Sequence, residues 1–460
     1  MAASLCSAQG QKHRAFILTD VENEPDDSES LVRLMLYSDC IDIEGIVATT
    51  SVHMQTSTHP ETIHRIIDAY GKVRDNLVKH SSGFPDASYL HSVVHSGPVE
   101  YGMKALAKGK TSEGTEALIK AIKSKDKRPL YVSAWGGVNT LAQALFILSN
   151  KSSKKELASL ISKIRVYTIS DQDDSGIWIR RNFPDLFFIV SPGTYDNATW
   201  SGIMDTEGDA LYKEYISNSW LSENIQQGKG PLGACYPDVA YGMEGDTPSW
   251  LALIPNGLND PERPDWGSWG GRYEYYLPTE IPDKGFNGGV PVEDEPHAIW
   301  TNAEDAVYDY TPGEYGKAVV RGRVPVKGFK ATLWRWRADF QNDFAARMDW
   351  CLKSYEEANH SPVITECPEK LTVKSGSFVE MEAQATDPDG DSVSYLWFNY
   401  PEAGTYDRYI PIGSAENIHK VNFRAPRVEK EETLHFILKV TDKGSPALTS
   451  YRRIIVTVQP

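Results

Sequence analysis

The segment from residue 14 to about residue 190 alternates between short apolar runs and amphipathic stretches, and this alternation constrains the fold more than any other feature. Short apolar runs bounded by turn residues predict buried strands, and apolar residues at helical spacing predict the helices that cover them. Such alternation is typical of βα units on a parallel sheet. The predicted strands are 15–19, 43–48, 130–133, 164–169 and 186–190, and the predicted helices are 27–37, 60–78, 115–123 and 138–148.

The remaining sequence predicts a loop region, one helix and a second domain. From residue 193 to about 331, periodicity gives way to Gly, Pro, Trp and Tyr, a composition typical of ordered loops around a cleft. A helix is predicted over 333–359, with its aromatic residues as core anchors. The predicted strands after it are 370–374, 378–383, 392–398, 434–441 and 452–458. We therefore expect an α/β domain with a Rossmann-like, mostly parallel sheet over 14–360, followed by an Ig-like β-sandwich over 361–460.

Length, charge and cysteine usage narrow the class of protein. The 460 residues exceed what one hydrophobic core usually supports, which agrees with two domains. The net charge of −16 disfavours a nucleic-acid partner, and no apolar run is long enough to cross a bilayer. Five scattered cysteines without CxxC spacing indicate neither a zinc site nor a dense disulfide framework. The fragment Ser4–Ala8 resembles part of a signal peptide, so we expect a secreted or periplasmic protein.

Five carboxylates directly follow the first predicted strand. They are Asp20, Glu22, Glu24, Asp26 and Asp27. An open α/β sheet binds its ligands beyond the carboxyl ends of its strands, so these acids stand where a site is expected. Because so many carboxylates cannot all stay ionised together without a cation, a hard ion such as Ca²⁺ is the simplest partner. The alternative is a solvated acidic turn that caps a helix.

Later segments offer partners for this acidic rim. Asp171-Gln172-Asp173-Asp174 also follows a predicted strand, and Glu244-Gly245-Asp246 carries acids far downstream. The two glycines of Trp135-Gly136-Gly137 allow the backbone to approach a ligand, so a main-chain carbonyl there is a further metal ligand candidate. A metal held by two chain segments lowers the pKa of a bound water, and a neighbouring carboxylate accepts its proton. This arrangement predicts hydrolytic chemistry.

The motifs resemble those of the calcium-dependent nucleoside hydrolases. Asp20-Val21-Glu22-Asn23-Glu24-Pro25-Asp26-Asp27 is similar to their D-x-D-x-x-x-D-D element, and Trp135-Gly136-Gly137-Val138-Asn139-Thr140 is similar to their Gly-Gly turn. The resemblance implies a nucleoside hydrolase fold. It also implies a Ca²⁺ site and a set of roles: metal ligands Asp20, Glu24, Asp27, Asp246 and the Trp135 carbonyl, a base at Glu22 or Glu24, and sugar contacts at Asp26 and Asn139.

A closer resemblance is to the nucleoside hydrolase-like branch labelled "cellulose-binding protein", whose members carry a C-terminal Ig-like domain. Asn23-Glu24-Pro25-Asp26-Asp27 and the segment from Asp171 to Asn182, with Trp178, are similar to that branch. Glu22 stands where nucleoside hydrolases have an Asp that binds calcium and activates water. Gly245 stands where many have a His that helps the nucleobase leave. Other candidates to protonate a leaving group are His53, Asp173, Asp174 and Glu244.

Aromatic residues near glycines favour a carbohydrate ligand. Trp266 and Trp269 are candidates to cover the apolar face of a sugar, with packing of the long loop as the alternative. We expect a calcium-dependent glycosidase that acts on a carbohydrate, with a furanoside in a glycan as the preferred substrate. The alternatives are a non-catalytic carbohydrate-binding protein and a true nucleoside hydrolase. The sequence does not predict the oligomeric state.

Overall fold

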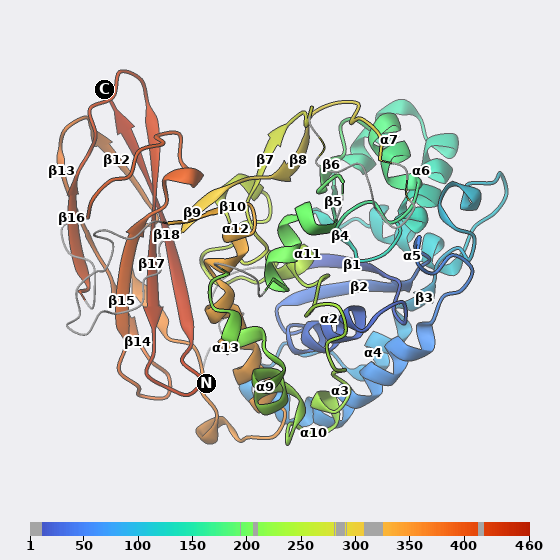
Figure 1. The fold of residues 1–460 in the computed structure, drawn as a ribbon, viewed down its shortest axis with the longest axis horizontal. Coiled ribbons are helices and arrows are strands. Elements are labelled where there is room, and N and C mark those ends of the chain that lie inside the picture. Colours follow the sequence, from blue (N-terminus) through green and yellow to red (C-terminus); the bar gives the residue numbers. More distant parts are fainter. Residues whose placement is uncertain are drawn as a thin grey trace.

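The protein has an α/β domain and a β-sandwich that lie side by side (Figure 1). The computed structural model describes residues 12–193, 195–205, 210–279, 281, 290, 292–307, 325–412 and 418–460. The predicted order, a mostly parallel α/β fold followed by a β-sandwich, is confirmed. Among the described residues, no helix combines the length and apolar character needed to cross a membrane.

One large sheet organises the α/β domain. Its strands are β1 (His13–Thr19), β2 (Ile41–Ala48), β3 (Val94–Ser96), β4 (Leu130–Ala134), β5 (Ile164–Thr168), β6 (Phe187–Ile189), β7 (Tyr273–Tyr276) and β8 (Ile299–Asn302). Their order is β3-β2-β1-β4-β5-β6-β8-β7, and only the β7–β8 pair is antiparallel. The strand order reverses between β1 and β4, which is where such sheets form a ligand crevice beyond their carboxyl ends.

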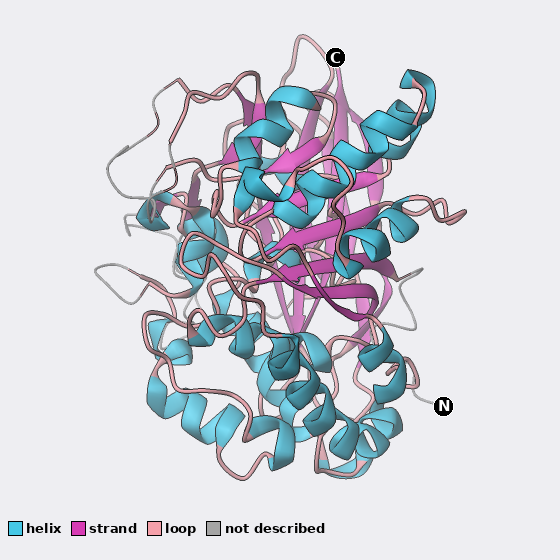
Figure 2. Ribbon diagram, turned by 90° about the vertical axis from the view of Figure 1, so that its right-hand side faces the viewer, coloured by secondary structure: helices cyan, strands magenta, loops and turns pink. Residues whose placement is uncertain are grey.

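Helices cover both faces of this sheet, as Figure 2 shows from the side of the α/β domain. They are α2 (Pro25–Leu36), α3 (Pro60–His80), α4 (Ala87–Ser92), α5 (Glu113–Ile122), α6 (Asn139–Lys151), α7 (Lys154–Ile161) and α8 (Ser175–Asn182). Successive residues of β1 enter opposite cores: Ile17 packs with the α2 and α3 side, and Leu18 packs with the α5 and α6 side. This two-sided burial explains why the strands appear in the sequence as continuous apolar runs.

Short elements fill the loop region. The helices are α9 (Asn218–Leu221), α10 (Gly230–Gly233), α11 (Pro248–Leu251), α12 (Ala331–Trp334) and α13 (Arg337–Asp349), and the strands are β9 (Asp305–Val307) and β10 (Val326–Gly328). The prediction of one helix over 333–359 is wrong in its extent, because α13 ends at Asp349. Ser354 and Glu357 form a capping box that starts a separate turn. The predicted anchors Trp336, Phe340 and Phe344 are fully buried, as expected.

The described residues of the C-terminal domain form eight strands. They are β11 (Val363–Glu366), β12 (Lys370–Lys374), β13 (Phe378–Glu382), β14 (Gln384–Thr386), β15 (Ser394–Asn399), β16 (Lys420–Arg424), β17 (Glu432–Thr441) and β18 (Thr449–Gln459). They form the sheet β12-β18-β17-β15 and the pairs β13-β16 and β11-β14. Alternate residues of β17, such as Phe436 and Leu438, fill the sandwich core, whereas Ile437 belongs to the core of the other domain.

An aromatic cluster joins the two domains. Trp336 contacts Tyr400 and Tyr451 edge-on, at centroid distances of 6.2 and 5.6 Å. Trp269 donates from Nε1 to the Tyr451 hydroxyl at 3.2 Å, and the buried Arg453 donates to the carbonyl of Gly267 at 2.7 Å. The domains therefore share one continuous apolar core, and we expect them to unfold together.

This shared core gives a testable stability effect. Replacing Trp336 by Ala removes a fully buried ring between the domains and is expected to cost about 3–5 kcal/mol of the free energy of unfolding. Urea unfolding followed by tryptophan fluorescence and far-UV circular dichroism measures this cost. Wild-type curves from the two probes are expected to coincide, and two separate transitions would contradict a shared core.

Candidate metal centre and cavity

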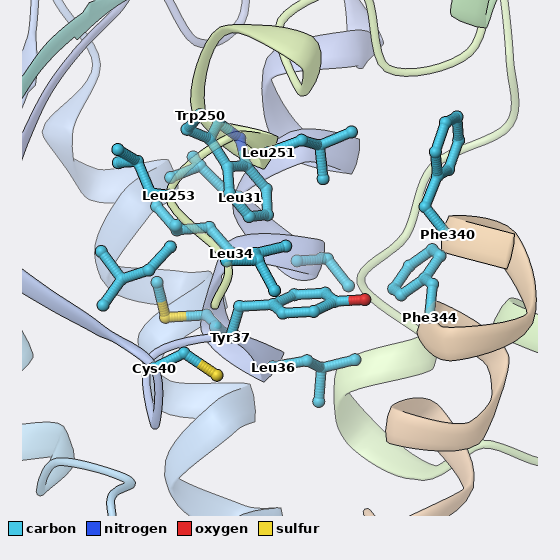
Figure 3. Close-up of a cluster of buried hydrophobic side chains, with 14 of the residues drawn as sticks. Leu31, Leu34, Leu36, Tyr37, Cys40, Trp250, Leu251, Leu253, Phe340 and Phe344 are labelled. Atoms are coloured by element: carbon cyan, nitrogen blue, oxygen red, sulfur yellow. The ribbon is translucent and has the colours of Figure 1, made fainter. Parts of the chain in front are cut away.

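Two helix starts bring the acidic residues together. The chain turns after β1, where the Asn23 amide donates to the Asp20 carbonyl at 3.0 Å, and α2 then begins at Pro25. Its first turn carries Asp26 and Asp27. Asp246 lies just before α11. Figure 3 shows Leu31 and Leu34 of α2 in the same buried cluster as Trp250 and Leu251 of α11. Hydrophobic packing of these two helices therefore places their acidic N-terminal ends together.

The acids gather at the wall of a cavity of about 430 Å³. One carboxylate oxygen from each of Asp26, Asp27 and Asp246 lies within 4.8 Å of the other two. The predicted convergence of Asp27 with Asp246 is therefore observed. The cavity is lined by Asp20, Asn23, Glu24, Pro25, Asp26, Asp27, His53, Trp135, Ile169, Gln172, Tyr195, Trp200, Met204, Tyr241, Gly242 and Asp246.

The electrostatics of this cluster fit a divalent cation. Burial, followed by the charges of the neighbouring acids, holds the pKa of Asp27 and of Asp246 well above its ordinary value. Burial also raises the pKa of Asp20 to about 6. The Oδ2 atoms of Asp20 and Asp246 are buried and have no hydrogen-bond partner within the described part of the chain. Unpaired buried carboxylate oxygens are costly, and an ion with oxygen ligands satisfies them.

Three glycines allow this crowding. A Cβ atom at Gly136 would lie 2.5 Å from Asp20 Oδ1, and one at Gly137 would lie 2.5 Å from Asp173 Oδ2. A Cβ at Gly245 would lie 2.8 Å from Asp26 Oδ2. Glycine is therefore a steric requirement at Gly136 for Asp20 of the cluster, and at Gly137 for the neighbouring loop of Asp173. The Trp135 carbonyl, an expected metal ligand, accepts a hydrogen bond from the Gln172 side-chain amide.

A buried ion pair fixes the loop that carries Asp246. Arg33 Nε of α2 lies 2.5 Å from Glu244 Oε2, and both side chains are fully buried. Glu244 also accepts from Tyr236 at 2.9 Å and from Thr247 at 2.7 Å. The backbone amide of Glu244 donates to the Glu29 carboxylate. Burial and the charge of Glu244 raise the pKa of Glu29 to about 9. The prediction that Glu244 contacts substrate is wrong, because its carboxylate is fully buried and already bound by Arg33, Tyr236 and Thr247.

Glu22 also departs from its predicted role. Its backbone has a φ of 79°, in the left-handed region, and it is not among the residues that line the cavity. Its carboxylate instead accepts from Thr62 and lies 3.3 Å from His59 Nδ1. In this left-handed backbone conformation, the Glu22 side chain points toward the start of α3. Glu24 lines the cavity and is the remaining candidate base.

Three other predicted substrate contacts are structural. Asn139 is fully buried, accepts from Thr49 at 2.8 Å and donates to the Glu100 carbonyl at 2.9 Å. Asp173 accepts from the backbone amide of Asn139 at 3.0 Å, and Asp174 accepts from the amide of Met103 at 2.7 Å. These side chains hold the loops around the cavity and do not line it.

The aromatic predictions need a similar correction. Trp178 packs edge-on against Phe183, and Asn182 donates to the Trp178 carbonyl at 2.8 Å, at the end of α8. Trp266 contacts His435 of the β-sandwich at a centroid distance of 5.0 Å, and Trp269 lies in the interface between the domains. The packing alternative that the sequence left open therefore holds for Trp266 and Trp269.

The loop region supplies lining residues that the sequence did not reveal. Tyr195, Trp200 and Tyr241 stand on the cavity wall, together with the predicted His53. His53 Nε2 lies 3.0 Å from the Tyr195 hydroxyl. Tyr195, Trp200 and Tyr241 lie in a region without helical or strand periodicity, so no sequence pattern identified them as lining residues. Gln172 lay inside a segment noted for its acids, yet its amide, and not those acids, reaches the cavity.

Comparison with known proteins agrees with this architecture. A family model described as "Cellulose-binding Sde182, nucleoside hydrolase-like domain" matches residues 14–273. The chain belongs to this family. A second model, "Cellulose-binding protein Sde0182, C-terminal domain", matches residues 378–458.

Two further similarities concern individual proteins. The chain is 33% identical to a solved nucleoside hydrolase-related hypothetical protein from Saccharophagus degradans, described as associated with carbohydrate metabolism. That match covers 98% of this chain and 100% of the other, with a TM-score of 0.81. A 177-residue stretch is 25% identical to Chitinase A of Pseudoalteromonas piscicida and covers 38% of this chain but 20% of the chitinase. The family resemblance and the nucleoside hydrolase-like fold are thus confirmed.

Proposed function

We propose that this member of the Sde182 family is a calcium-dependent glycoside hydrolase that acts on a furanoside within a glycan. The observation that carries the proposal is the convergence of Asp20, Asp26, Asp27 and Asp246 at one cavity, with two buried oxygens that lack partners. Bound Ca²⁺ would supply a charge that orients sugar hydroxyls and a water molecule. The ligands would be Asp20, Asp27, Asp246 and the Trp135 carbonyl. This carbonyl would bind the ion in place of the hydrogen bond that it now accepts from Gln172.

The residues of the chain have separate tasks in this reaction. Glu24, at the start of α2, accepts the proton of the attacking water, because it lines the cavity without being assigned to the metal and burial raises its pKa. Asp26 contacts the sugar hydroxyls from the first turn of α2. The carboxylates stabilise the positive charge that develops on the sugar ring as the glycosidic bond breaks.

The cavity wall favours a leaving group other than a nucleobase. The position before Asp246 is Gly245, and a Cβ there would lie 3.0 Å from the Trp200 ring and 3.2 Å from the Met204 sulfur. Any side chain at this position would therefore crowd Asp26 and Trp200. The motifs shared with nucleoside hydrolases therefore include the acidic cluster but not the His that helps a nucleobase to leave. The names of the relatives, which refer to cellulose and carbohydrate metabolism, support a glycan, and such a substrate suits a secreted or periplasmic protein.

Product release tests the proposal. The wild-type protein is expected to release p-nitrophenol from at least one member of a panel of p-nitrophenyl furanosides in the presence of Ca²⁺, and to lose that activity in EDTA. Inosine and uridine serve as nucleoside comparisons. Turnover of nucleosides alone would contradict a glycan substrate.

A non-catalytic carbohydrate-binding protein is the second candidate, because Glu22 turns away from the cavity. Calorimetric binding of furanose oligosaccharides that persists without any turnover would favour this interpretation. It predicts no difference in product release between the wild type and Glu24→Gln, whereas the hydrolase loses its base in that variant.

Calcium removal gives a prediction for stability. Saturation of the site at about 1,000 times Kd is expected to stabilise the folded state by about 4 kcal/mol, because the unfolded chain does not assemble the ligands. Differential scanning calorimetry with Ca²⁺ and with EDTA measures this shift in Tm. An equal Tm under both conditions would contradict the metal site, and Mg²⁺ is the control for a general ionic effect.

A further inference from the structure

His53 and Tyr195 form a hydrogen-bonded pair on the cavity wall. His53 follows β2, and Tyr195 begins a short turn after β6, so the two residues come from distant parts of the sequence. His53 Nε2 and the Tyr195 hydroxyl are 3.0 Å apart, and both residues line the cavity that holds the acids. The pair offers two exchangeable protons at one wall.

The surroundings hold Tyr195 on the wall of the cavity that the acids also line. Its ring meets Trp200 edge-on at a centroid distance of 5.8 Å and an interplanar angle of 72°. Burial raises the pKa of Tyr195, so the phenol stays protonated.

The other predicted donors are engaged elsewhere. Glu244 is paired with Arg33, Asp173 holds the start of α6, and Asp174 accepts from Met103. Tyr241 also lines the cavity, but its side chain is 85% exposed and thus stands in water. Among the described lining residues, Tyr195 is therefore the half-buried hydroxyl that is hydrogen-bonded to an imidazole in contact with solvent.

We propose that Tyr195 is the general acid that protonates the leaving oxygen of the glycoside, and that His53 restores its proton. This inference rests on the proposed hydrolase. The Tyr195 O–H proton passes to the glycosidic oxygen as the bond from that oxygen to the anomeric carbon breaks. His53 Nε2 passes its proton to the tyrosine oxygen while solvent delivers a proton to Nδ1 of the same exposed ring, so that the imidazole stays neutral. The water that has lost its proton to Glu24 forms the new bond to the anomeric carbon. His53 and Glu24 then exchange their protons with solvent, and an alcohol and a sugar leave.

The test compares two leaving groups on the same sugar. p-Nitrophenolate leaves without a proton, whereas methoxide needs one, so only the methyl glycoside depends on a general acid. The Tyr195→Phe variant removes the proton and keeps the ring that packs on Trp200. We expect it to lose about 10²–10⁴-fold in kcat/KM on the methyl furanoside and far less on the p-nitrophenyl furanoside. His53→Gln is expected to show the same selectivity with a smaller loss.

The controls separate the possible outcomes. Tyr275→Phe, on the exposed edge strand β7, is the matched control and is expected to match the wild type on both substrates. Equal losses on both substrates in Tyr195→Phe, with unchanged Tm and Ca²⁺ binding, would overturn the assignment of the acid while leaving the hydrolase intact. Absence of any turnover by the wild type would overturn both the hydrolase and this inference.

Discussion

The Asp246→Asn protein is expected to lose calcium binding and hydrolysis while becoming more stable than the wild type in the absence of metal. Asp246 supplies one of three carboxylates whose oxygens lie within 4.8 Å of one another, and its own Oδ2 has no partner in the described structure. Loss of a direct ligand is expected to weaken Ca²⁺ binding and kcat/KM by more than about 10²-fold, since even outer-shell partners cost about 10- to 100-fold. Removal of one buried charge relieves the repulsion among the rest.

Two measurements check these opposite effects. Isothermal titration with Ca²⁺ reports the affinity, and urea unfolding in EDTA reports the free energy of unfolding. Asp185→Asn, at an exposed carboxylate after α8, is the matched control and is expected to change neither quantity. A metal-free Asp246→Asn protein that is markedly less stable than the wild type would show that the carboxylate is structural and not a ligand.

The Arg33→Met protein is expected to lose about 3–5 kcal/mol of the free energy of unfolding, because Glu244 is left as an unpaired buried charge. The guanidinium also lies 4.0 Å from the Phe344 ring centroid and donates to Gln341. Since the Glu244 loop carries Asp246, we expect weaker Ca²⁺ binding as well, even though Arg33 does not line the cavity. Urea unfolding in EDTA and calcium titration measure the two losses.

The double variant Arg33→Met with Glu244→Gln sharpens this prediction. Neutralising both partners removes the buried charge, so the double variant is expected to be more stable than Arg33→Met alone. The amide introduced by Glu244→Gln still offers an oxygen to Tyr236 or Thr247. If the double variant were as unstable as the sum of the two single variants, the ion pair would not be the cause of the loss.

Much of the fold followed from local patterns. The five predicted strands of the first domain all correspond to observed strands, because each lies between two helical layers and is apolar on both sides. Strands β3, β7 and β8 were missed, since each has only three or four residues and none is a continuous apolar run. The helix predicted over 333–359 was too long, because hydrogen bonds of Ser354 with Glu357, and not the apolar spacing, decide where the chain turns.

The candidate site likewise has features that the sequence predicts and features that it does not. The sequence by itself placed Asp20, Asp26 and Asp27 together, because a strand end and the first turn of the next helix are neighbours in any βα unit. It pointed to Gly136 and Gly137 for a related reason, since a close backbone approach needs glycine. The clustering of these acids and the need for glycine each depend on a few residues that are close together in the sequence.

Only the tertiary structure decided which distant side chains share the cavity. Packing of α2 against α11 brought Asp246 to Asp27, the left-handed backbone at Glu22 turned that acid away, and the domain interface took up Trp269. Tyr195 and Trp200 reached the cavity from loops without periodicity. Such placements result from burial of apolar surface and satisfaction of polar groups across the whole molecule, and neither condition is written in the spacing of residues along one segment.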